Sequence, residues 1–75
     1  MTALPVLSGK EVVRALEAFG WQVARQRGSH IVMTKAGEYA SLSVPDHKEF
    51  GKGTLRSLLR AANLTIDEFV AVLKP

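Results

Sequence analysis

Apolar side chains recur along this chain with two different spacings, and each change of spacing marks a predicted element. In residues 9–19 they return every three or four positions, which indicates a helix. Ser8 and Glu11, at the start of this stretch, have the S-x-x-E spacing of a helix-capping box. Gly20 can adopt the left-handed conformation that often ends a helix. A first helix is therefore predicted over residues 9–19. Its apolar positions are Val12, Val13, Ala15, Leu16 and Phe19.

Three short segments with strand-like patterning follow this helix. Gly28 and Gly37 separate them, and Pro45 ends the last one. Segments this short, joined by glycine-containing turns, are typical of an antiparallel meander. The predicted strands cover residues 21–25, 29–35 and 39–44.

The register of the first hairpin decides where His30 points, and two turns are possible. A two-residue turn at residues 28–29 would pair Arg27 with His30 and split the large apolar side chains between both faces. A three-residue loop, residues 26–28, places these side chains together on one face. We expect the second register, which leaves His30 opposite Ala24 on the other, outward face. The side chains that would then share the packed face are Trp21, Val23, Ile31 and Met33.

The last third of the chain predicts two further helices. An apolar stripe at helical spacing covers residues 54–62, and Asn63 is suited to end it. Thr65 and Glu68 form a second capping box, which opens a short third helix. The predicted order, α-β-β-β-α-α, is an α+β fold in which helices cover one face of a three-stranded antiparallel sheet. The side chains expected to pack are Ala40, Leu42 and Val44 on the third strand, Leu55, Leu58, Leu59 and Ala62 on the second helix, and Phe69, Val70, Val72 and Leu73 on the third.

Length and composition narrow the possible functions. A chain of 75 residues is expected to form one domain, residues 1–75, with a thin core and no deep substrate cavity. It contains no cysteine, which excludes disulfides and thiolate metal sites. It also lacks a secretory signal and any apolar run of the roughly 20 residues that a membrane span needs, so a cytoplasmic protein without membrane contact is expected. The net charge of +3 would attract a polyanion if the basic side chains gather on one surface.

His30 is the first candidate for chemistry. Histidine is the usual general acid or base because an imidazole can gain or lose a proton near neutral pH. Its neighbours Arg25, Arg27, Gly28 and Ser29 offer guanidinium, amide and hydroxyl donors, which are the groups that hold a phosphate. The alternative is a surface histidine at the end of a turn.

A second group of candidates begins with the loop that contains His47. This histidine is a possible auxiliary residue, or simply an exposed loop position. The two histidines lack the spacing of a zinc site, so neither a metal nor another cofactor is expected. Lys52, Gly53, Thr54 and Arg56 lie at the predicted start of the second helix, where free amides and the helix dipole favour an anion.

The motifs that are missing limit the chemistry further. The chain has no paired carboxylates, no nucleotide-binding glycine motif and no nucleophilic serine motif. What remains is acid–base chemistry on a phosphodiester. RNA suits such a site because its own 2′-hydroxyl can attack the adjacent phosphorus, so the protein needs only a proton-transfer group and donors for the phosphate.

Several segments, taken in order, resemble the HicA-type (YcfA-like) mRNA interferase toxins of toxin–antitoxin pairs. They are "LSGKEVVRALEAFGW", "RQRGSH" and "VPDHKEFGKGTLRSLLRAANLTIDEFV". The resemblance implies a fold like that of double-stranded-RNA-binding domains and a metal-independent endoribonuclease in which His30 is essential. It further implies RNA contacts at Lys52, Gly53, Thr54 and Arg56.

The same resemblance implies partners. A HicB-type antitoxin would bind the toxin and mask His30, mRNA would be the substrate, and the free toxin would be a monomer or weak dimer. Two other functions stay open at this point: a non-catalytic RNA-binding module of the same fold, and a structural partner that offers its sheet face to another protein.

Overall fold

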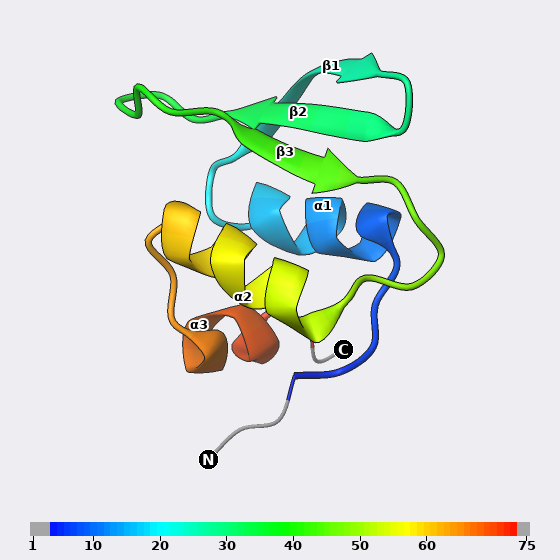
Figure 1. The fold of residues 1–75 in the computed structure, drawn as a ribbon. Coiled ribbons are helices and arrows are strands. Elements are labelled where there is room, and N and C mark those ends of the chain that lie inside the picture. The colour runs from blue at the N-terminus through cyan, green and yellow to red at the C-terminus, as the bar shows by residue number, and fades with distance from the viewer. Residues whose placement is uncertain (1–3, 74–75) are drawn as a thin grey trace.

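The computed structural model describes residues 4–73 and has three helices and a three-stranded antiparallel sheet in the order β1-β2-β3. In Figure 1 the sheet forms one layer, α1 and α2 lie against one of its faces, and α3 packs beside α2. This is the α+β, double-stranded-RNA-binding-domain-like fold that the sequence predicts. The elements are α1 (Gly9–Glu17), β1 (Gln22–Arg27), β2 (His30–Thr34), β3 (Leu42–Pro45), α2 (Lys52–Ala61) and α3 (Ile66–Ala71).

Both predicted capping boxes are confirmed. At α1 the Ser8 backbone N–H donates to Glu11 Oε1 (2.9 Å), and the Glu11 N–H donates to the Ser8 hydroxyl (3.2 Å). Thr65 and Glu68 make the same reciprocal pair before α3, at 2.8 and 3.0 Å. Asn63 has a φ of 61° just after α2, which confirms its part in ending that helix.

The predicted loop of the first hairpin is wrong. Arg27 pairs with His30, so the strands are joined by a two-residue turn, Gly28 and Ser29, rather than by a loop over residues 26–28. Gly28 has a φ of 60° and Ser29 has no positive φ, which is the pattern of a type II′ turn. His30 therefore lies opposite Arg27 and not opposite Ala24.

A β-bulge explains why this tighter turn still gives one packed face. The register shifts between Val23 and Arg25, which leaves Ala24 as an extra residue on β1. An extra residue changes the phase of side-chain alternation, so Val23 comes opposite Met33 and returns to the packed side of the sheet. The two-residue turn would split the apolar side chains only if β1 were a regular strand. Val23 remains 46% exposed because β1 is an edge strand.

The core lies between the sheet and the helices, and most of its members are those predicted. Besides Val23, two expected members are absent from it. Ala40 is exposed, because β3 begins at Leu42 rather than at Tyr39. Val72 is 40% exposed, because it caps the end of α3 instead of lying within its packed turns. Fully buried large side chains are Trp21, Phe69, Leu16, Met33, Leu42, Leu55, Leu59, Val12 and Val44.

Candidate active site

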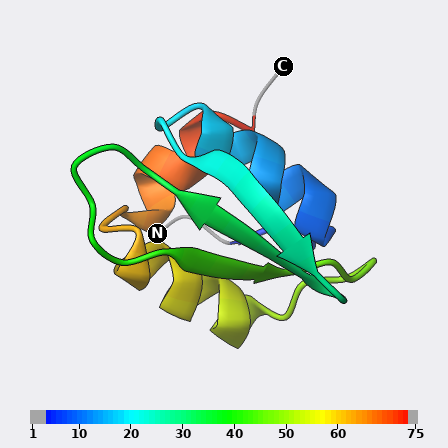
Figure 2. The ribbon, with the colours of Figure 1, turned by 90° about the horizontal axis from the view of Figure 1, so that it is seen from above.

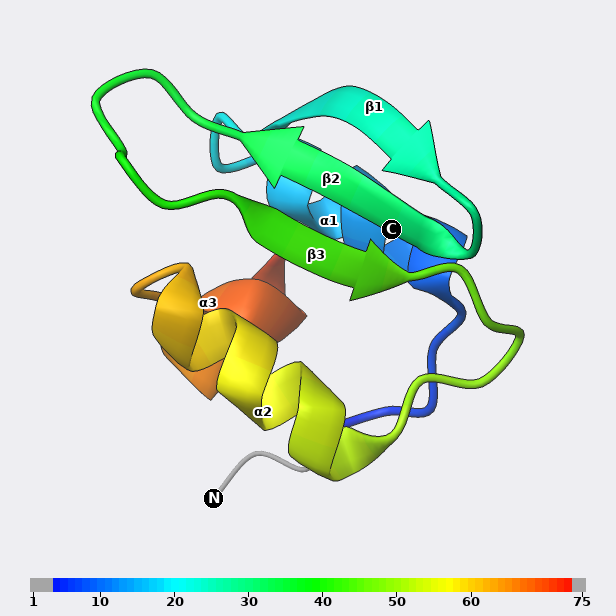
Figure 3. The same cartoon turned by 45° about the horizontal axis from the view of Figure 1, so that its top comes forward.

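His30 lies on the face of the sheet that no helix covers. Two residues of the same strand, Ile31 and Met33, point into the core and are only 5% and 0% exposed. Successive side chains on a strand point to opposite faces, so His30 points away from the helices, and it is exposed. Arg27 on β1 and Pro45 on β3 are its direct partners on either side. Figures 2 and 3 show this open face, with β2 between the other two strands.

The next row of the same face brings a second guanidinium to the site. Arg25 pairs with Val32, which in turn pairs with Ser43. Arg25 and Arg27 are both exposed on the edge strand β1, so both charges can reach a ligand. Val32 is 9% exposed and does not belong to the core cluster between the sheet and the helices. The face next to His30 thus combines the two arginine side chains with the apolar side chain of Val32 and the hydroxyl group of Ser43.

The turn that precedes His30 is open to solvent. Gly28 and Ser29 are both exposed, and a Cβ placed on Gly28 would meet no atom within 4 Å. The Ser29 carbonyl accepts a hydrogen bond of 2.7 Å from the Asp46 N–H, which attaches the turn to the loop after β3. The predicted group of Arg25, Arg27, Gly28, Ser29 and His30 therefore occupies one end of one sheet face.

The loop that contains His47 is held against the start of α1. The His47 carbonyl accepts a hydrogen bond of 2.8 Å from the Gly9 N–H, and the Phe50 N–H donates to the Leu7 carbonyl at 2.6 Å. His47 itself is exposed and follows Pro45, the β3 partner of His30, by two residues. The loop accordingly lies at the same end of the sheet as His30.

The start of α2 lies in a different layer from His30. Gly51 is its N-cap and provides no side-chain hydrogen bond to the helix, and residues 52–54 are exposed. Arg56 is exposed as well. Because α2 packs on the covered face of the sheet, these residues belong to another layer than His30, and Figure 3 shows the loop from β3 leading round that edge to α2. Helical spacing in the sequence does not reveal how the two groups lie relative to each other.

Two residues near His30, Gln26 and Asp46, were not among the predicted site residues. The Gln26 Nε2 group donates to the Gly28 carbonyl at 3.2 Å and to Asp46 Oδ2 at 3.3 Å. Gln26 stands between two arginines in the sequence, and Asp46 follows the proline that ends β3. Nothing in the sequence marks either residue as part of the site, because their contact appears only once the hairpin and the loop after β3 are placed in space.

A shifted carboxyl pKa is found at the start of α1, away from the open face. The pKa of Glu11 is lowered, first by the hydrogen bond from the Ser8 backbone N–H and then by the Ser8 side chain and the charge of Arg14. This shift belongs to the helix cap. Within residues 4–73, no three His, Cys, Asp or Glu side chains come together in a way that could hold a metal ion.

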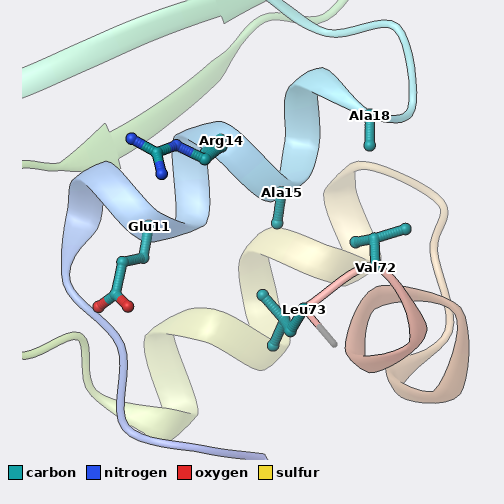
Figure 4. A pocket seen from close by; sticks show the side chains of 6 residues that line it. All are labelled: Glu11, Arg14, Ala15, Ala18, Val72 and Leu73. Atoms are coloured by element: carbon teal, nitrogen blue, oxygen red, sulfur yellow. The ribbon is translucent and has the colours of Figure 1, made fainter. Parts of the chain in front are cut away.

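Two hollows in the described part of the chain lie among the helices. One has a volume of about 210 Å³ between α1 and the end of α3, and Figure 4 shows its side chains. Another, of about 280 Å³, lies along α2 and the connection to α3. His30 lines neither of them, so it offers its imidazole on an open surface, which suits a polymer better than a small enclosed ligand. The first hollow is lined by Glu11, Arg14, Ala15, Ala18, Val72 and Leu73.

Comparisons with known proteins agree with this architecture. The family model "HicA toxin of bacterial toxin-antitoxin" matches residues 9–64. A solved structure, "Toxin-Antitoxin complex from Streptococcus pneumoniae", contains a chain that is 39% identical, with a TM-score of 0.70; the match covers 77% of this chain and 98% of that one. No curated protein matches the chain. None of the helices in residues 4–73 has the length and apolar character required to cross a bilayer.

The fold and the family match define a small α+β toxin of the toxin–antitoxin type, with helices on one face of its sheet and the other face open. The family model covers well over half of the chain. The chain belongs to the HicA toxin family.

Proposed function

We propose that this HicA-family toxin is a metal-independent endoribonuclease that cleaves mRNA, with His30 as its proton-transfer group. The observation that carries the proposal is the place of His30, exposed on the uncovered face and directly paired with Arg27. Side chains opposite each other on antiparallel strands have Cβ atoms about 4.5–5.5 Å apart. A guanidinium can therefore hold a phosphate beside the imidazole.

In the proposed reaction the RNA supplies its own nucleophile. The 2′-oxygen forms a bond to the adjacent phosphorus, and the bond from that phosphorus to the 5′-oxygen of the next nucleotide breaks. The proton lost by the 2′-hydroxyl and the proton gained by the 5′-oxygen balance, and the products are a 2′,3′-cyclic phosphate and a free 5′-hydroxyl. His30 carries out one of these proton transfers, while Arg27, Arg25 and donors of the Gly28–Ser29 turn stabilise the charge that builds up on the phosphate oxygens.

Further contacts to the RNA are proposed in the helical layer. The exposed residues Lys52, Gly53, Thr54 and Arg56 lie at the start of α2, and His47 lies on the loop between this helix and the His30 end of the sheet. Amides and cations at a helix start favour phosphates. A strand of RNA that passes over this edge of the sheet would meet both groups, with His47 in an auxiliary role.

The open face is also proposed as the surface that an antitoxin covers. A HicB-type antitoxin lying there would mask His30 and block access of RNA. The similarity to a chain of a toxin–antitoxin complex supports an antitoxin partner for this chain, and Val32 adds an apolar floor to the face. Such a toxin would act in the cytoplasm, where mRNA is found, and as a free protein it would be a monomer or weak dimer.

The decisive experiment replaces His30 and separates chemistry from binding. Purified wild type and His30→Ala are compared for cleavage of an RNA oligonucleotide, and for binding of its 2′-deoxy analogue, which lacks the nucleophile. We expect cleavage to fall by about 10²–10⁴-fold, the usual contribution of a general acid or base, with binding little changed. Thr34→Ala, at the opposite end of β2, is the matched control and should cleave like the wild type.

The outcomes distinguish three kinds of protein. Equal cleavage by wild type and His30→Ala would refute the assignment of His30. RNA binding without cleavage by any variant would identify a non-catalytic RNA-binding module instead. If Arg25 and Arg27 hold phosphates, the affinity for RNA must fall as the salt concentration rises. Replacing both arginines with alanine should then make the negative slope of log K against log salt less steep by about 1.4.

A further inference from the structure

The side chain of Gln26 joins two parts of the molecule that meet next to His30. Its Nε2 group donates to the Gly28 carbonyl at 3.2 Å and to Asp46 Oδ2 at 3.3 Å. A carboxamide nitrogen carries two hydrogens, so one group can make both bonds at once. Twenty positions separate Gln26 from Asp46 in the sequence, and the bond connects β1 to the loop after β3.

Asp46 completes the connection through its backbone. Its N–H donates to the Ser29 carbonyl at 2.7 Å. The two carbonyls of the turn, on Gly28 and Ser29, are therefore both held, one by the Gln26 side chain and the other by the Asp46 amide. Since the Asp46 carboxylate also accepts from Gln26, the three groups form a closed set of hydrogen bonds around the turn. His30 is the next residue along the chain.

The link lies at a place where other restraints are few. The turn is exposed, and a Cβ on Gly28 would meet nothing within 4 Å, so no packed side chain holds it from outside. β1 is an edge strand, so it pairs with β2 alone, and a bulge at Ala24 separates the last three pairs before the turn from the rest of the ladder. The hydrogen bonds of Gln26 and Asp46 therefore add to the strand pairing that places Arg27 opposite His30, and they restrain the turn between these two residues.

We propose that Gln26 and Asp46 are positioning residues, which hold the Gly28–Ser29 turn so that Arg27 and His30 face the same phosphate. This inference rests on the proposed function, in which His30 transfers a proton during RNA cleavage. Neither Gln26 nor Asp46 touches the reacting atoms. Their effect is on geometry, and a small misplacement of a catalytic group is enough to slow a reaction strongly.

The test reverses the polarity of the link. In Gln26→Glu the new carboxylate cannot donate, so both side-chain bonds are lost and Asp46 is repelled. Adding Asp46→Asn restores one bond in the opposite direction, because the asparagine amide can donate to the carboxylate introduced at position 26. Two controls match the charge changes: Gln22→Glu on the same strand, and Gln26→Glu with Glu49→Gln, which has the net charge of the restored pair without its hydrogen bond.

We expect Gln26→Glu to lower kcat for RNA cleavage roughly tenfold, with the affinity for the 2′-deoxy analogue within about twofold of that of Gln22→Glu. The reversed pair should recover most of kcat, and the Glu49→Gln combination should not. Hydrogen exchange of the Asp46 amide supplies a readout independent of activity. It should be faster in Gln26→Glu and return toward the wild-type rate in the reversed pair.

Failure of this inference differs from failure of the proposed function. If His30→Ala cleaves like the wild type, the proposed function is wrong. If His30→Ala is inactive but Gln26→Glu behaves like Gln22→Glu, or Glu49→Gln rescues as well as Asp46→Asn, only the positioning role is wrong. An unchanged exchange rate of the Asp46 amide in Gln26→Glu would also overturn it.

Discussion

Gly9 is the position at which one added methyl group should disturb the link between α1 and the site loop. It is the first residue of α1 and is buried. A Cβ built there would overlap the carbonyl oxygen of Pro45 and come within 2.9 Å of the Asp46 Cα. Both are backbone atoms, which cannot rotate away as a side chain could. The Gly9 N–H also donates to the His47 carbonyl, so helix and loop cannot separate without losing that bond.

The expected cost of Gly9→Ala is the difference between two effects. Forcing a methyl group into a packed site costs about 1–3 kcal/mol. Alanine improves helix propensity over glycine by at most about 1 kcal/mol in a helix interior, and less at the first position. The net effect is a loss of about 1–2 kcal/mol. In a domain of this size each kcal/mol lowers the Tm by about 4–8 °C, so the Tm should fall by about 5–15 °C.

The assay is thermal and urea unfolding followed by circular dichroism, with Gly53→Ala as the matched control. Gly53 lies in the first turn of α2, and a Cβ there would meet no atom within 4 Å. The same substitution should therefore stabilise the protein, by at most the value of about 0.5–1 kcal/mol that applies in a helix interior. A Gly9→Ala variant as stable as the wild type would show that the loop does not press on the start of α1, and the reasoning would be wrong.

The hydrogen bonds of this loop also predict where the disturbance spreads. The Asp46 N–H donates to the Ser29 carbonyl, so a loop displaced by Gly9→Ala should pull on the turn before His30. Amide chemical shifts of Ser29 and His30 should then change in Gly9→Ala and stay near wild-type values in Gly53→Ala. If the chemical shifts of Gly9→Ala changed only within α1, the disturbance would not pass through the loop to the turn, and this expectation would be wrong.

Two further predictions concern the α1 cap and the core. Because hydrogen bonds from Ser8 lower the pKa of Glu11, the stability that its carboxylate contributes is present above the unfolded pKa and lost as pH falls through the lowered one. The stability difference between wild type and Glu11→Gln should therefore shrink between about pH 6 and pH 3 in urea titrations, and a constant difference would contradict the linkage. Trp21 is 1% exposed and its indole N–H has no hydrogen-bond partner within residues 4–73. Trp21→Phe removes this unsatisfied donor and should cost less than about 2 kcal/mol in urea unfolding, against about 3–5 kcal/mol for Trp21→Ala; equal costs would refute the argument.

The local elements were predictable from the sequence because their causes lie within a few residues. Ser8 and Glu11 are three positions apart, and the pair of hydrogen bonds between them starts α1 whatever the rest of the chain does. Asn63 ends α2 through its own backbone preference. The membership of the core followed for similar reasons, since helical spacing alone shows which side of α2 is apolar.

The neighbours of His30 depended on long-range contacts. A regular alternation of side chains disfavours the two-residue turn, and the bulge at Ala24 makes that turn compatible with one packed face. A bulge shifts alternation by one residue, and periodicity in the sequence does not reveal where it occurs. The same holds for the separation of the α2 start from the open face.

The order of elements, their caps and the presence of a histidine among phosphate-binding side chains can all be derived from the order of the amino acids. The packed molecule was needed to learn that Arg27 stands opposite His30, and that Gln26 reaches Asp46 across the end of the hairpin. The difference comes from the range of the interactions. Capping and periodicity act within one or two turns of the chain, whereas register is set by side chains that pack against helices distant in the sequence.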